Sequence, residues 1–228
     1  MPTATSVVTQ DTYLNGAAAF QAFNFSTNIT AQAGWVTGGA GGAKRSLLYF
    51  PIAGVLPVSS TAITLSLFIK SVTVGGASLE LFGFFESYTD SYIVGSQATW
   101  LERATAALWT APGGGEWDAT PFVNFTGPVG ADDETVFSID VTDVVLPAVV
   151  AQWAGIWLIF KNIGESGVTN QFSFCSLEGS DAFPTLTATY EDMAIRSPII
   201  GNFKKARIYS LMSMIVPLLA GALASLVC

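Results

Sequence analysis

The chain has 228 residues, half of them hydrophobic and only 11% charged, and its net charge at neutral pH is −8. This length allows one large domain or two small ones. So few charges indicate that much of the surface is buried in a core, in partners or in lipid. The absence of histidine removes the commonest general base and the commonest zinc ligand.

The charge is unevenly divided along the chain. Residues 1–191 contain 16 acidic and 5 basic side chains, whereas residues 192–228 contain 1 acidic and 4 basic ones. The acidic part should repel nucleic acid, so no nucleic-acid partner is expected. The first residues have neither a basic region nor a long apolar run, which predicts synthesis and folding in a cytoplasm. The two cysteines, Cys175 and Cys228, exclude a disulfide framework.

Residues 1–191 read as an all-β domain. Gly, Pro, Ser, Thr, Asn and Asp interrupt this part at intervals of roughly 8 to 12 residues, as in β-sandwiches. The runs between them are rich in β-branched and aromatic residues. They predict strands at 45–52, 62–72, 78–87, 135–141, 155–162, 170–177 and 184–191. In the second run Leu65, Leu67 and Ile69 alternate with residues for the other face, which is typical of a strand with one buried side.

One short helix is expected between the strands at 135–141 and 155–162. Thr142 could cap the run that follows it, and Pro147 lies near the first turn of that run. The helix would lead directly into the strand at 155–162.

The composition changes after Glu191. Residues 192–207 form a basic linker, and residues 208–228 contain no charge. A helix of that length spans roughly 30 Å, the thickness of a bilayer core. Two interpretations stay open: a membrane anchor, or a helix that docks on other subunits. The candidate anchoring or docking residues are Lys204, Lys205, Arg207, Leu211, Ile215, Leu218 and Leu219.

Several motifs within residues 8–190 occur in an order known from one family. They are DTYLNG at 11–16, RSLLYFPI at 45–52, ATW at 98–100, PGG at 112–114, FSIDVTDVV at 137–145 and FPTLTATY at 183–190. In this order they resemble the DNRLRE domain family, a jelly-roll β-sandwich related to carbohydrate-binding modules. The resemblance implies a non-enzymatic jelly-roll. Members of that family occur beside secreted enzymes, at cell surfaces and in viral structural proteins. The residues after 191 depart from the family pattern.

The stretch ATWLERATAALWTAPGGGEWD at 98–118 places three tryptophans around a glycine-rich turn. Trp100 and Trp109 are expected to cover the core, because tryptophan buries a large area. Trp117, beside Glu116 and Asp118, is the best candidate for an exposed ring, and these three residues are the candidate glycan contacts. No pair of carboxyl groups can be assigned the roles that a glycosidase needs, so no catalytic residue, cofactor or metal site is predicted.

Together these features predict a non-enzymatic structural protein of a virus or phage particle. It would be a capsid, capsid-decoration or surface protein built on a jelly-roll with one short helix, and its hydrophobic C-terminal helical tail would attach it. The expected partners are copies of itself and other virion proteins, with membrane lipid through 208–228 and glycans as further candidates. The alternative is a tail-anchored carbohydrate-binding protein at a cell surface.

Overall fold

The structure is a computed structural model, and it describes residues 1–37, 42–76, 78–87, 91–117, 119–163, 165, 169–180 and 182–192. These residues belong to one compact unit, Met1–Asp192. The predicted tail at 208–228 lies outside them, as does almost all of the linker. Within the described part, no helix combines the length and the apolar character needed to cross a bilayer.

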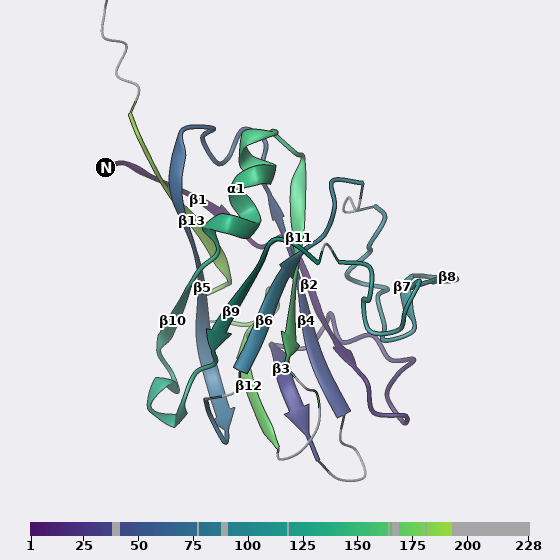
Figure 1. Ribbon diagram of the computed structural model, residues 1–228. Helices are drawn as coiled ribbons and strands as arrows, with labels where there is room; N and C mark the ends of the chain where they lie inside the picture. The colour runs from purple at the N-terminus through teal and green to yellow at the C-terminus, as the bar shows by residue number, and fades with distance from the viewer. Residues whose placement is uncertain are drawn as a thin grey trace, which may run out of the picture. The chain divides into compact units, whose positions relative to one another are not determined.

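The body is built almost entirely of strands (Figure 1). The strands are β1 (Thr3–Val7), β2 (Gln10–Asn15), β3 (Thr30–Val36), β4 (Gly42–Pro51), β5 (Ser60–Thr73), β6 (Ser78–Gly83), β7 (Glu102–Ala104), β8 (Ala107–Leu108), β9 (Phe122–Thr126), β10 (Val136–Asp140), β11 (Gly155–Asn162), β12 (Asn170–Cys175) and β13 (Thr185–Tyr190). The helices are the 3-10 turn Gly130–Asp132 and α1 (Thr142–Val150). The all-β class is therefore confirmed.

The long strand β5 joins two parts of one curled antiparallel sheet. Residues 60–68 of β5 pair with β13 and β10, and β13 pairs in turn with β1. Residues 69–73 of β5 pair instead with β12, which continues into the order β12-β3-β4-β11-β6-β9. Strand β2 adds to β4. Because β5 belongs to both parts, the sheet folds back on itself and encloses a core (Figure 1).

Each strand predicted from the sequence is present, and the alternation in β5 is confirmed. Ile63, Leu65, Leu67 and Ile69 are fully buried, while the residues between them are only partly buried. The helix also forms, but the capping prediction is wrong. Val141 occupies the N-cap position of α1, and Thr142 is its first helical residue. The Thr142 backbone N–H donates instead to Asp140 Oδ1 at 3.0 Å.

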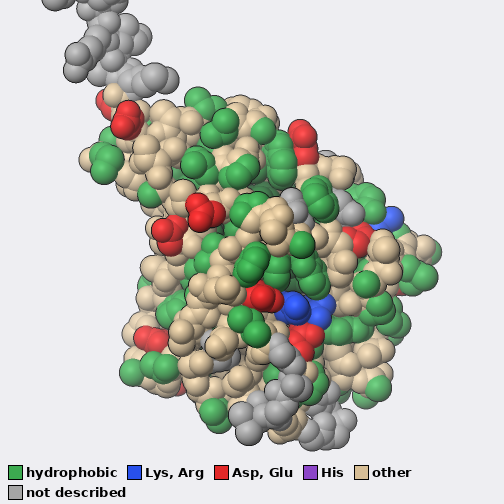
Figure 2. Space-filling model, in the orientation of Figure 1, with side chains coloured by type: hydrophobic (Ala, Val, Ile, Leu, Met, Phe, Trp, Pro, Cys, Tyr) green, Lys and Arg blue, Asp and Glu red, His purple; other side chains and the backbone are tan. Residues whose placement is uncertain are grey.

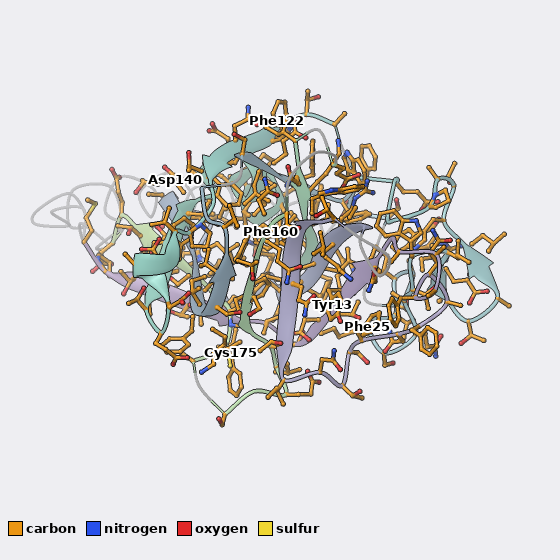
Figure 3. All side chains as sticks on the ribbon, turned by 90° about the horizontal axis from the view of Figure 1, so that it is seen from below. Tyr13, Phe25, Phe122, Asp140, Phe160 and Cys175 are labelled. Atoms are coloured by element: carbon orange, nitrogen blue, oxygen red, sulfur yellow. The ribbon has the colours of Figure 1, made fainter. Side chains whose placement is uncertain are left out.

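The main core lies inside the curl and is rich in phenylalanine. Phe160 of β11 packs edge-on against Phe172 of β12, with ring centroids 6.5 Å apart, and against Phe125 of β9 at 6.0 Å. Figure 3 shows Phe160 deep in the interior. Fully burying one such side chain contributes about 1.5–3 kcal/mol, so these contacts stabilise the packing of β9, β11 and β12 around the core.

Candidate functional site

Strands β4 and β11 bury both of their faces. One face contacts the main core, and the other supports a second hydrophobic cluster that includes Leu47, Trp157 and Ile159. The segment 84–121, which contains β7 and β8, supplies Phe84, Ile93, Ala98 and Trp109 to the same cluster. Burial on both sides explains why these strands read as continuous apolar runs in the sequence. Charged and aromatic side chains gather at the margin of this cluster.

The three tryptophans of 98–118 occupy two different environments. Trp109 is buried in the second cluster, and its Nε1 donates to Thr99 O at 2.8 Å. Trp100 and Trp117 are only partly buried and pack against the margin of the cluster. Trp109 is therefore a core residue, as predicted, Trp100 covers the edge of the cluster, and Trp117 keeps part of its ring available to solvent.

Arg45 links both marginal tryptophans to the loops around them. Its Cζ lies 4.8 Å from the centroid of the Trp100 ring and 5.3 Å from that of Trp117, within cation–π range. Its Nε and Nη2 donate to the two carboxylate oxygens of Glu165, each at 2.6 Å. Its Nη1 donates to Gly113 O at 2.7 Å. The Arg45 side chain is only 8% exposed, so this ion pair is largely shielded from water.

Close packing requires glycine at positions 113 and 114 of the glycine-rich turn. Gly113 has a φ of 80°, and a Cβ there would lie 2.7 Å from Arg45 Nη1 and 2.8 Å from the Trp100 ring. Gly114 has a φ of 76°, and a Cβ there would lie 2.9 Å from Ile159 Cδ1. Any side chain at either position would be strained and would push the loop away from Arg45.

Lys161 and three aromatic rings extend this margin across β11, β6 and β9. The Lys161 Nζ lies 5.7 Å from the Trp117 ring centroid and 6.0 Å from that of Phe82. It pairs with Glu80, its cross-strand neighbour, at 3.5 Å. Phe82 lies 5.3 Å from Trp117 and stacks at 5.4 Å on Phe122, its partner in β9.

We call these six residues the aromatic–cation strip: Trp100, Arg45, Trp117, Lys161, Phe82 and Phe122. Figure 2 shows basic side chains in the middle of this face, with acidic side chains beside them and hydrophobic ones around them. Figure 3 shows Phe122 at the margin of the molecule. Partly exposed rings beside a donor (Lys161) and an acceptor (Glu80) can stack on a flat ligand and orient it by hydrogen bonds. The two basic residues of the strip are paired with Glu165 and Glu80, and this pairing leaves the strip close to neutral.

The other two predicted glycan contacts do not join the strip. Glu116 is buried, and its Oε1 accepts hydrogen bonds from the backbone N–H and the hydroxyl of Thr110. Glu116 therefore holds the turn at 110–116 together and does not present its carboxylate to a ligand. Asp118 lies outside the described residues. So do the predicted docking residues, which are Lys204, Lys205, Arg207, Leu211, Ile215, Leu218 and Leu219.

A second polar site lies beside β2, which pairs with β4 on the side opposite to β11. Asp11 is buried, and its Oδ2 accepts a hydrogen bond from the Leu177 backbone N–H at 2.7 Å. Burial, together with the nearby Glu178 carboxylate, raises the pKa of Asp11 to about 7. Both carboxyl groups line a groove of about 230 Å³. Across the described ranges, no three Asp, Glu, Cys or His side chains come together in a way that could hold a metal ion.

No family model matches the chain, and no curated protein matches it. The functional interpretation therefore depends on the residues and geometry described above.

Proposed function

We propose that this chain is a non-enzymatic structural protein of a virus or phage particle. Its body would be a jelly-roll sandwich of the DNRLRE type, displayed on the shell or built into it, and residues 208–228 would attach it there. The observation that carries the proposal is the change in charge and hydrophobicity of the sequence after β13. That strand ends at Tyr190, and 21 uncharged residues begin at 208, directly after a basic cluster. A run of this kind needs burial in lipid or protein.

The low charge content of the chain supports a role in an assembly. Only 11% of residues are charged, against about 25% in typical soluble domains. Large apolar side chains such as Ile29, Leu108 and Val136 are well exposed on the body. Neighbouring copies or other virion proteins would cover such a surface.

Deleting residues 203–228 should leave a folded, soluble body that no longer joins its particle or membrane. Both hydrophobic clusters lie within residues 1–192, so the melting temperature should stay unchanged. Co-sedimentation with native particles or vesicles measures attachment, and thermal unfolding checks the fold. The proposal fails if the truncated protein attaches as well as the full chain does.

The substitution Leu218→Arg separates lipid from protein attachment. A charge near the centre of a membrane span costs about 2.5–3.5 kcal/mol on insertion scales. If the segment crosses lipid, this variant should lose membrane insertion. If the segment docks on protein, mild detergent should leave the native chain on its particle.

A second candidate function is carbohydrate binding, and the aromatic–cation strip favours it. The rings of Trp117 and Phe122 are partly exposed, and Phe82 and Lys161 hold them in place. The near-neutral charge of the strip suits a neutral glycan. Such binding is compatible with a surface protein of a particle as well as with a protein anchored at a cell surface.

Replacing Trp117 or Phe122 with alanine should weaken binding of a neutral polysaccharide by about tenfold each. One lost stacking contact corresponds to about 1.4 kcal/mol. Affinity electrophoresis through soluble glucan, xylan and mannan gives the measurement. Phe23→Ala is the control, because this ring is 56% exposed and lies outside the strip. Equal retardation of all three variants and the native chain would exclude the strip as a glycan site.

A further inference from the structure

Beyond Thr142 and Asp143 in its first turn, helix α1 is apolar on its outer side as well as on its inner side. Its inner side is buried through Val144, Val145, Ala148 and Val149. Asp143 is its only charged residue, and Val150 on the outer side is 60% exposed. A surface helix usually presents polar residues to water, so the outer side of α1 has the character of a contact surface.

The apolar surface continues beyond the helix. Leu146, Pro147 and Val150 line an open groove of about 400 Å³ along α1. Gln152, just after the helix, lines a neighbouring groove together with the loop 54–59. In that loop Val58 is 50% exposed and Val55 is 36% exposed. We call α1 and the loop 54–59 the α1 end of the body; Figure 2 shows hydrophobic side chains over it at the top of the view.

The described chain ends against this same surface. The backbone N–H of Glu191 donates to Ser59 O at 3.2 Å, and the Ser59 hydroxyl donates to Glu191 O at 3.0 Å. From Asp192 the chain continues through 193–207 to the uncharged segment. Fifteen residues span at most about 50 Å when fully extended. A surface that holds residues 208–228 is therefore within reach of the α1 end.

We propose that the α1 end is a lipid-contact face, which rests on the bilayer that holds residues 208–228. This inference rests on the proposed function, in the case in which residues 208–228 attach the chain to a lipid bilayer. A second copy is a poorer occupant, because Asp143, Glu191 and Asp192 lie at this end and two copies would bring like charges together. The same carboxylates would be repelled by anionic lipid, so contact of this face is strongest on a zwitterionic bilayer, whatever lipid the basic residues of the linker prefer.

The contact would be shallow and would depend on the tether. Val55, Val58 and Val150 are small side chains that reach only the boundary between headgroups and acyl chains. A tether holds them at a high effective concentration beside the bilayer, so a weak contact becomes populated. The body would then lie in one orientation on the membrane, with the opposite end of β5 pointing away from it.

The test uses the full chain bound to phosphatidylcholine vesicles, with a fluorophore either on α1 or just beyond the far end of β5. Cys228→Ser removes the terminal thiol, and Cys175 is buried. Val150→Cys carries the dye NBD at the α1 end. Val74→Cys is the matched control: it is 64% exposed and directly follows β5, whose length separates it from the α1 end by about 40 Å. Nitroxide lipids labelled near the headgroup act as quenchers.

Quenching at position 150 should exceed quenching at position 74 by at least twofold. Equal quenching, in a chain that floats with the vesicles, would overturn this inference and leave membrane attachment intact. A chain that does not float with the vesicles would overturn both. Shielding of the dye at position 150 that rises with protein concentration without lipid would assign the face to a second copy instead.

Discussion

Replacing Arg45 with methionine should lower the free energy of unfolding by about 3 kcal/mol. The substitution keeps an apolar stem but leaves Glu165 and Gly113 O without their donors. Breaking a buried ion pair from one side costs about 3–5 kcal/mol. The lower end of this range applies because the Glu165 side chain is 20% exposed. The free energy of unfolding is measured by urea denaturation, and an unchanged m-value shows that the substitution altered stability alone.

The matched control is Lys70→Met. Lys70 pairs with Glu134 at 3.0 Å, but these side chains are 28% and 62% exposed. Exposed pairs contribute about 0–1 kcal/mol, so this variant should stay close to the native stability. An Arg45→Met change no larger than the Lys70→Met change would contradict the assignment of Arg45 as the anchor of the strip. Glycan binding should also fall with Arg45→Met, because the rings of Trp100 and Trp117 both lose the guanidinium group that holds them in position.

The stability of the body should also depend on the protonation of Asp11. Its pKa is about 7 in the folded protein and about 3.9 in an unfolded chain. The folded state therefore binds this proton more tightly. The contribution to stability is complete below pH 4 and is lost as the pH rises toward and through 7. Integrated over this window, the loss amounts to roughly 4 kcal/mol.

Asp11→Asn isolates this effect, because the amide has the shape of the neutral acid. The variant should be more stable than the native chain by roughly 4 kcal/mol at pH 8, and the difference should disappear toward pH 4. Asp140→Asn is the control of opposite sign: hydrogen bonds from Thr142 lower the pKa of Asp140, so this variant should lose stability at pH 8. If Asp11→Asn proves no more stable than the native chain at pH 8, the prediction is wrong.

The local sequence pattern was sufficient to predict those strands that have clear alternation or a continuous apolar run. Strand β5 was readable from Leu65 and Leu67, and β11 from GIWLIF. Strand β3, with the sequence TAQAGWV, was not predicted, because alanine and glycine carry little strand preference. It forms because β12 and β4 supply hydrogen bonds and packing on its two sides. Tertiary context of that kind is not visible in a seven-residue window.

The candidate site was predictable only in part, for a related reason. Trp117 was indicated by its neighbours in the sequence. Arg45 and Lys161 were not, because each lies at one end of an apolar strand and reads as a boundary residue. Their acidic partners are 120 and 81 residues away. Only the pairing of β11 with β4 on one side and β6 on the other brings these charges beside the rings.

The pairing of β1 with β13 has a consequence for synthesis. Thr3 pairs with Thr189, so the first and the last strand of the body are neighbours. Such non-local pairing forms slowly, and here it cannot form until nearly the whole body has left the ribosome. Until then β1 has no partner strand and β5 has an open edge on the side that β13 will occupy, and open edges favour association with other nascent chains. A newly made chain would therefore gain most from a chaperone just before β13 emerges.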